Sequence, residues 1–290
     1  MSNSIAKFKN YTSLLDEVFK NAILTSDLMS PASTAKEGNN ANEIIVNKIS
    51  MDGLGNYSRN SGYVGGDVTL TQETVAFNYE RGRMFTVDTM DNEETAGIAY
   101  GQLAGEFIRT KVAPEADAFL FATLASEAGI GSASGALTTS NVIAAISSAI
   151  VTMDEAEVPQ ESRYLYVTPT VHRLIMDLDT TKSKQVLDGF AKIIKVPQSR
   201  FYTAITMNDG TTDGQTAGGY TKDATNGKDI NFMIVEKSAL LYFNKHVAPK
   251  VIRPEDNQTA DAWKYGYRKY GLVDVYENKV AGIYVHHKTA

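Results

Sequence analysis

A long run of strand-like sequence around a glycine-rich centre, residues 44–88, constrains this chain more than any other feature. Apolar and polar residues alternate along its second half, and the apolar set is Val75, Phe77, Tyr79, Phe85 and Val87, interrupted by Arg81 and Arg83. Five glycines between positions 53 and 66 exclude a helix there. The pattern predicts a two-stranded hairpin with arms of about 20 residues, reaching roughly 65 Å. An isolated two-stranded hairpin is marginally stable at best, so this one is expected to lie on something else.

Composition excludes several classes of function. The 290 residues carry a formal net charge of −6, no cysteine and four histidines. A disulfide scaffold, a thiolate zinc site, an iron–sulfur cluster and a cysteine nucleophile are therefore excluded. The acidic balance argues against a surface that clamps DNA, and no apolar run approaches the ~18 residues of a membrane span. No apolar segment follows Lys7 and Lys9, so no secretory signal is expected.

A compact monomer of this size would expose roughly 12,000 Å² and bury about 74% of its unfolded surface.

The hairpin segment is flanked by helical patterns. Apolar residues at spacings of three and four within residues 1–30 predict a short amphipathic helix, and residues 30–42 predict an extended linker. After 88 the period changes, and a long helix is predicted with Thr89 or Asp91 as its cap. Pro114 is expected to kink this helix or split it, and residues 129–135 (GIGSASG) to end it.

Residues 136–250 predict a compact α/β unit. The expected elements are a helix from Ser140 to about Ala156, a strand at 164–167, a helix introduced by Pro169, and strands at 201–207 and 232–235. Between the last two strands, residues 208–229 predict a long loop without apolar periodicity. The C-terminal stretch returns to strand patterns over 263–275 and 280–285.

No spacing in the chain assembles a catalytic, cofactor or metal site. The glycines at 129, 131 and 135 follow a helix and have the wrong spacing for a dinucleotide loop, and Gly227–Lys228 lacks the hydroxyl of a P-loop. His172 and His246 stand alone, whereas His286 and His287 are adjacent and would face opposite sides of a strand. Asp177 and Asp179 begin like a calcium loop, but the glycine and final glutamate are missing. We therefore predict no catalytic, cofactor-binding or metal-binding residues.

One basic and aromatic stretch leaves two interpretations. Lys264, Arg268 and Lys269 lie among Trp263 and Tyr265, a combination that could stack on or clamp nucleic acid. Aromatic residues at a period of two are more typical of a half-buried strand, which is the interpretation we favour.

Three stretches resemble the major capsid protein of tailed double-stranded DNA bacteriophages, which has the Hong Kong 97 fold. Residues 111–117 (KVAPEAD), followed by Phe119 and Leu120, resemble the spine-helix segment of that family. Residues 163–169 (RYLYVTP) resemble the strand and helix start of its axial domain, and residues 261–285 its closing strands. Their order along one chain extends the resemblance from about Glu43 to Val285.

The resemblance implies an α+β fold divided in the family's manner. Its parts would be an N-terminal arm (1–43), an E-loop hairpin (44–88), a peripheral (P) domain with the spine helix (89–139) completed by closing strands (251–290), and an axial (A) domain (140–250). Residues 208–229 would then form a loop at the capsomer centre or surface. Only about 43 residues precede the E-loop, which favours a separate scaffolding protein or a trimmed chain. Lys48 lies in the E-loop, but no partner for a covalent crosslink is identifiable, so none is predicted.

The function implied is structural, with no enzymatic activity and no cofactor. The chain would be a major capsid subunit that self-assembles into hexamers and pentamers of an icosahedral shell enclosing phage double-stranded DNA. Its expected partners are further copies of itself, scaffolding, portal and decoration proteins, and packaged DNA through weak non-specific contact, with no membrane. Its expected location is the virion, after assembly in the bacterial cytoplasm. Two alternatives stay open: an encapsulin-type nanocompartment shell, and an enzyme or ligand-binding protein with a site around His172.

Overall fold

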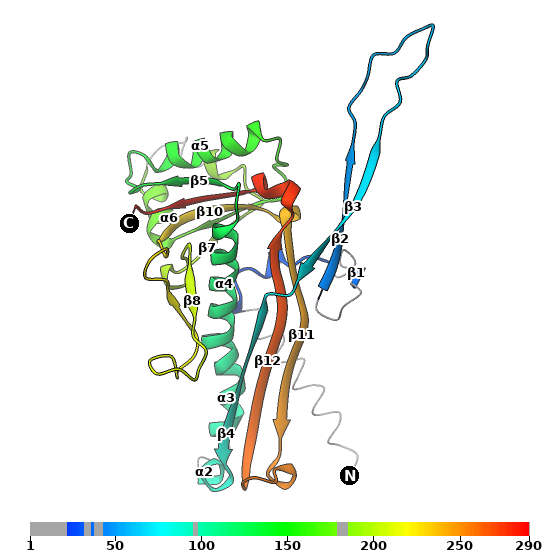
Figure 1. The fold of residues 1–290 in the computed structure, drawn as a ribbon. Helices are drawn as coiled ribbons and strands as arrows, with labels where there is room; N and C mark the ends of the chain where they lie inside the picture. The colour runs from blue at the N-terminus through cyan, green and yellow to red at the C-terminus, as the bar shows by residue number, and fades with distance from the viewer. Residues whose placement is uncertain (1–21, 32–35, 38–42, 95–97, 179–184, 290) are drawn as a thin grey trace.

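The chain folds into an elongated body with a projecting hairpin (Figure 1). The computed structural model describes residues 22–31, 36–37, 43–94, 98–178 and 185–289. A long helix runs beside a three-stranded sheet, an α/β unit lies at one end of both, and the β2–β3 hairpin extends beyond this body. In the described part of the chain, no helix is both long and apolar enough to cross a membrane.

The long helix is interrupted beside Pro114, as predicted. Helix α3 (Ile98–Phe107) passes into a π-helical turn (Ile108–Val112) and then into α4 (Ala113–Ser126), with the proline in the first turn of α4. A proline has no amide hydrogen and its ring clashes with the carbonyl one turn earlier. The wider π turn lies where this clash would occur, and the backbone stays helical at Val112 and Ala113. The proline thus divides the helix without ending it.

The long sheet corrects the expected hairpin of residues 44–88. Only β2 (Glu43–Met51) and β3 (Val68–Ala76) form the hairpin, so its arms have nine residues each. β4 (Tyr79–Asp88) instead pairs antiparallel with β12 (Ala262–Val275) over ten residue pairs, and β11 (Leu240–Ile252) pairs with the other edge of β12. Asn78 lies where the chain changes sheet, and its side-chain amide donates to Val273 O at 2.7 Å and accepts from Val273 N at 3.1 Å.

The α/β unit is built on a five-stranded sheet of order β5-β13-β10-β6-β7. Its strands are β5 (Gly131–Ser134), β6 (Arg163–Val167), β7 (Lys192–Lys195), β10 (Ile230–Glu236) and β13 (Ile283–His287). Two strands pair across the expected division of the chain. β11 lies within residues 140–250 but belongs to the long sheet, and β13 lies within residues 251–290 but belongs to this one. The cause is pairing: β11 and β12 match over twelve residue pairs, whereas β13 pairs with β10 and β5.

The central strand β10 separates two apolar cores. All seven of its residues are buried, and alternate side chains enter opposite cores. Met233 and Val235 pack towards the long helix and long sheet. Phe232 and Ile234 pack under α5 (Val142–Glu155) and α6 (Pro169–Met176), which cover the other face (Figure 1). A strand buried on both faces shows no alternation of polar and apolar residues.

The remaining elements are small. Thr168 caps α6 by accepting from Val171 N at 3.4 Å, which places the helix start at Pro169 as predicted. The helix expected from Ser140 has Asn141 at its N-cap position instead. The strand expected over 201–207 is only β8 (Ile205–Met207), and the expected loop 208–229 contains its partner β9 (Tyr220–Lys222). Short elements complete the chain: β1 (Lys36–Glu37), α2 (Thr89–Glu94) and 3-10 turns at Ser26–Leu28, Gln198–Arg200, Lys237–Ala239, Pro254–Asp256 and Glu277–Gly282. Most of the helix expected within residues 1–30 lies outside the described residues.

Candidate functional site

The base of the hairpin is part of the molecule's own core. Ile44 and Val75 are cross-strand partners, and both are buried against Leu241, Phe243 and Leu272 of the long sheet. Lys48 forms ion pairs with Glu73 (3.7 Å), on the same side of the hairpin, and with Glu277 in the 3-10 turn that follows β12. These contacts fix the direction in which the hairpin leaves the body.

The distal half of the hairpin presents an apolar surface to solvent. Ile49 pairs with Leu70 and Met51 pairs with Val68, and these four side chains are 60–71% exposed. Cross-strand partners share a face, and alternate residues point to opposite faces. The four side chains therefore lie on the face opposite to Ile44 and Val75. We call them the distal apolar face.

Apolar exposure is concentrated in this hairpin. Of the twelve large apolar side chains that are exposed in the described part of the chain, eight lie between residues 49 and 70: Ile49, Met51, Leu54, Tyr57, Tyr63, Val64, Val68 and Leu70. The accessible surface of the chain is 16,890 Å², against roughly 12,000 Å² for a compact monomer of this size. Exposed apolar surface concentrated in one element is typical of sites that interact with other molecules.

Two arginines of β4 hold the 208–219 loop against the long sheet. The Arg81 guanidinium donates to Glu115 Oε1 at 2.8 Å, to Asn208 O at 2.7 Å and to Gly219 O at 3.2 Å. Arg83 donates to Thr216 O at 3.1 Å. The sequence showed these residues only as interruptions of an apolar alternation. Two arginines at positions i and i+2 interrupt an otherwise apolar strand face. This pattern could have indicated that the face contacts another polar segment of the chain.

A buried carboxylate joins three segments of the chain. Asp117 of α4 is fully buried and accepts hydrogen bonds from Thr25 Oγ1 (2.9 Å), from the amides of Leu24 and Thr25 (3.2 and 3.3 Å) and from Arg200 (3.1 Å). Burial raises the pKa of this carboxyl, and the hydrogen bonds and Arg200 oppose that shift. Asp117 belongs to the KVAPEAD segment, where the sequence alone gave no role for it.

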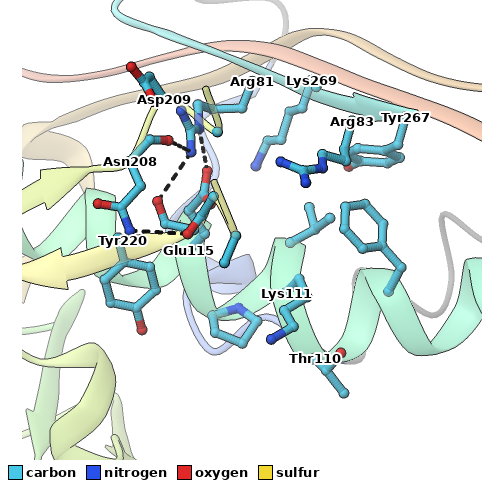
Figure 2. A pocket seen from close by; sticks show the side chains of 18 of the residues that line it. Arg81, Arg83, Thr110, Lys111, Glu115, Asn208, Asp209, Tyr220, Tyr267 and Lys269 are labelled. Atoms are coloured by element: carbon cyan, nitrogen blue, oxygen red, sulfur yellow. Dashed lines mark hydrogen bonds and ion pairs between the residues drawn. The ribbon is translucent and has the colours of Figure 1, made fainter. Parts of the chain in front are cut away.

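A pocket of about 980 Å³ lies between the long sheet, the long helix and the 208–219 loop (Figure 2). Strands β4 and β12 contribute Arg83, Tyr267 and Lys269, and the helix contributes Lys111 and Glu115. Burial lowers the pKa of the Lys269 ammonium to about 8. The sequence did not predict this pocket, because its walls come from three separate parts of the chain.

The residues weighed for chemistry in the sequence do not converge. His172 lies half-exposed on α6, and its side chain makes no hydrogen bond or ion pair within the described residues; burial and Lys195 lower its pKa. His286 is buried and bonded to Asn231 at 3.0 Å, and Asp177 pairs with Arg173 one helical turn away. The described residues contain no group of three or more side chains suited to a metal. Lys269 points to the opposite face of β12 from Lys264 and Arg268, so the three do not form one basic stripe.

Comparison with known proteins was informative only at the level of structure. No family model matches the sequence, and no curated protein matches it significantly. A structure from Mycobacterium phage Che8 superposes with a TM-score of 0.60 at 14% identity, covering 91% of this chain and 90% of that one. The capsid structure of Staphylococcus phage Andhra gives 0.57 at 11% identity, covering 91% and 86%. The fold is that of phage capsid proteins. The expected α+β Hong Kong 97 fold is thereby confirmed.

The same fold also occurs outside phages. The virus-like particle from Pyrococcus furiosus gives a TM-score of 0.57 at 12% identity, covering 94% of this chain and 96% of that one. Phage capsid folds and the fold of this particle are thus about equally similar to the chain.

Proposed function

We propose that this protein is the major capsid subunit of a tailed phage or prophage, a structural protein without enzymatic activity. Copies of the chain assemble into hexamers and pentamers of an icosahedral shell around double-stranded DNA. The observation that carries the proposal is the distal apolar face, which the subunit's own body leaves uncovered. A second copy is the natural cover, because an identical subunit offers the same surfaces at every position of a shell.

In the proposed shell, each part of the chain has its own role. The hairpin 43–76 acts as the E-loop that reaches a neighbouring subunit. The long helix with β4, β11 and β12 forms the P domain, and the five-stranded sheet with α5 and α6 forms the A domain around the capsomer centre. Arg81 and Arg83 hold the 208–219 loop of the A domain on the P domain, and Asp117 holds residues 24–25 on the helix.

The remaining partners follow from charge and from the fold. A formal net charge of −6 repeated over a shell limits adhesion to packaged DNA, so contact with DNA is weak and non-specific. The further proposed partners are a scaffolding protein and a portal protein, with a decoration protein as an optional addition to the shell. Assembly takes place in the bacterial cytoplasm, and the mature location is the virion.

Electron microscopy of the purified full-length protein tests the proposal. Closed shells or ring-shaped capsomers of uniform size are the expected result across a series of protein and salt concentrations. A monodisperse monomer under all of these conditions would overturn it.

The second function that an observation favours is a compartment shell of the encapsulin type. Its support is the likeness to the Pyrococcus furiosus virus-like particle, which covers nearly all of both chains. Mass spectrometry of particles isolated from the native source separates the two functions. Packaged double-stranded DNA with portal protein supports the phage capsid, whereas a single enclosed enzyme without DNA supports the compartment.

A further inference from the structure

The lining of the pocket between the long sheet, the long helix and the 208–219 loop combines cations with an apolar cluster. Arg83 and Lys269 extend from the strands into the space above the helix that carries Lys111 (Figure 2). Phe85, Leu103 and Phe107 meet Tyr267, which is the cross-strand partner of Arg83. The Phe107 ring lies 4.8 Å from Phe85 and 6.1 Å from Tyr267, measured between ring centroids.

The acidic residues of the lining are engaged by their own neighbours. Glu115 accepts from Arg81 and from Tyr79, at 2.8 and 3.1 Å. Glu106 is paired with Arg109 at 2.8 Å on the helix surface. Asp209 accepts from the amides of Thr211 and Thr212, at 2.8 and 2.9 Å. The lining carries five cationic side chains against these three carboxylates, so positive charge is in excess.

Two of the cations are not matched by a carboxylate. The hydrogen bond of Arg83 goes to a neutral carbonyl, Thr216 O, and Lys111 makes no ion pair within the described residues. Lys269 is only 2% exposed and lies over the Tyr79 ring at 5.3 Å. A bound anion would meet Arg83 and Lys111 at the mouth of the pocket and the ammonium of Lys269 at its depth.

We propose that this pocket binds an organic anion, in which one negatively charged group is joined to an aromatic ring or an alkyl chain. The charged group lies among Arg83, Lys111 and Lys269, and the apolar body lies against Phe85, Phe107 and Tyr267. The volume of about 980 Å³ is at the upper end of the range for small-molecule sites and far exceeds an inorganic ion. A ligand here touches three walls at once and favours the state in which the loop is held on the sheet. The inference does not depend on the proposed function.

Fluorescence titration with 8-anilinonaphthalene-1-sulfonate, an aromatic sulfonate, tests the site in the full-length protein. The titration is done in an Ile49→Thr/Leu70→Thr background, because the distal apolar face also attracts this dye. Arg83→Gln and Lys111→Gln are expected to weaken binding at least tenfold each, and Lys250→Gln, on β11 outside the pocket lining, to leave it within twofold. Both test residues are exposed, so these variants do not disturb the core. An affinity unchanged in Arg83→Gln and Lys111→Gln would overturn the proposal.

Competition with the bound dye, followed by fluorescence, identifies the apolar part of the ligand as an aromatic ring or an alkyl chain. Adenosine monophosphate presents an aromatic body with a phosphate, and dodecanoate presents an alkyl chain with a carboxylate. The proposal is supported if one of them displaces the dye at concentrations at least a hundredfold below those required for inorganic phosphate. The more potent competitor then shows whether the site prefers an aromatic ring or an alkyl chain. Equal potency of inorganic phosphate, or no displacement by either organic anion, would contradict the proposal.

Discussion

The five-stranded sheet and the distal half of the hairpin are both rich in apolar strand residues, but they are buried to opposite extents. All seven residues of β10 are buried between two cores. Ile49, Met51, Val68 and Leu70, at matched cross-strand positions, are 60–71% exposed. The sheet completes its burial within one chain, whereas in the proposed shell a second copy covers the distal half of the hairpin. Substitutions in the two regions should therefore affect different properties, namely the stability of the subunit and its assembly.

The largest expected effect is on assembly through the distal apolar face. Ile49→Thr with Leu70→Thr removes two aliphatic side chains from each proposed contact, at a cost of roughly 3 kcal/mol per contact. Association at each contact is then weakened by about a hundredfold, and the defect recurs at every interface of a shell. Electron microscopy and light scattering should show no closed particles, while urea unfolding should show a stability within ~0.5 kcal/mol of the unmodified subunit.

The opposite face of the hairpin supplies the control for this experiment. Ser50 and Thr69 are cross-strand partners on the face that carries Lys48. Ser50→Ala with Thr69→Ala changes the same number of side chains at the same distance from the body, and shells should still form. If both double variants fail to form shells, assembly does not depend specifically on the distal apolar face, and the prediction is contradicted.

The next largest effect is expected on folding, in the five-stranded sheet. Phe232 is fully buried and stacks on His286, with ring centroids 5.1 Å apart. Phe232→Ala should destabilise the subunit by about 3–5 kcal/mol, because it removes apolar burial and leaves a cavity. Urea unfolding below assembly concentration measures this loss. Val151→Ala, on the exposed side of α5, should change stability by less than about 0.5 kcal/mol, and an equal loss at both positions would contradict the comparison.

Local patterns predicted much of this molecule, and pairing between distant segments accounts for what they missed. The glycines and alternation of residues 44–88 indicated a long hairpin with a glycine-rich tip, and Pro114 indicated the break in the long helix. The alternation continued through Tyr79–Asp88 and gave no sign that these residues pair with β12. The pairing joins residues almost 200 positions apart, as the hydrogen bonds between the Asn78 amide and Val273 do. The pocket was unpredictable for the same reason, because Arg83, Lys111 and Lys269 are brought together only by the tertiary fold.

The third prediction concerns Asp117, where a polar group stabilises a region otherwise held by apolar contacts. Asp117→Ala leaves the amides of Leu24 and Thr25 and the guanidinium of Arg200 without this acceptor. We expect a loss of about 3 kcal/mol in urea unfolding, the low end for a broken buried pair, because Arg200 is partly exposed. Hydrogen exchange at Leu28, whose amide bonds to Thr25 O, should also accelerate. Asp177→Ala, which removes an exposed ion pair with Arg173, should cost only about 0.3–0.5 kcal/mol.

The fourth prediction concerns the pH dependence that Lys269 gives to the body of the subunit. Burial lowers the pKa of this ammonium from 10.5 to about 8. Between these values the unfolded chain binds a proton that the folded chain has released, so stability rises with pH. From pH 8 to 9.5 the gain is about 2 kcal/mol at most. Lys269→Met should abolish this rise in urea unfolding; a rise of the same size in the variant would assign it to other groups. Above pH 10 the raised pKa of Tyr79 acts in the opposite direction.

The smallest effect is expected at the contact between Arg83 and the 208–219 loop, which lies between the two regions compared above. Arg83→Gln removes one exposed hydrogen bond to Thr216 O, so global stability should fall by no more than about 1 kcal/mol. Local opening of the loop should increase, because Arg81 alone then holds it through Asn208 O and Gly219 O. Hydrogen exchange should therefore accelerate within residues 208–219 and stay unchanged in β10 and in the hairpin. Equal acceleration in β10 would mean that the loop and the five-stranded sheet open as one unit, and that this contact stabilises the whole subunit.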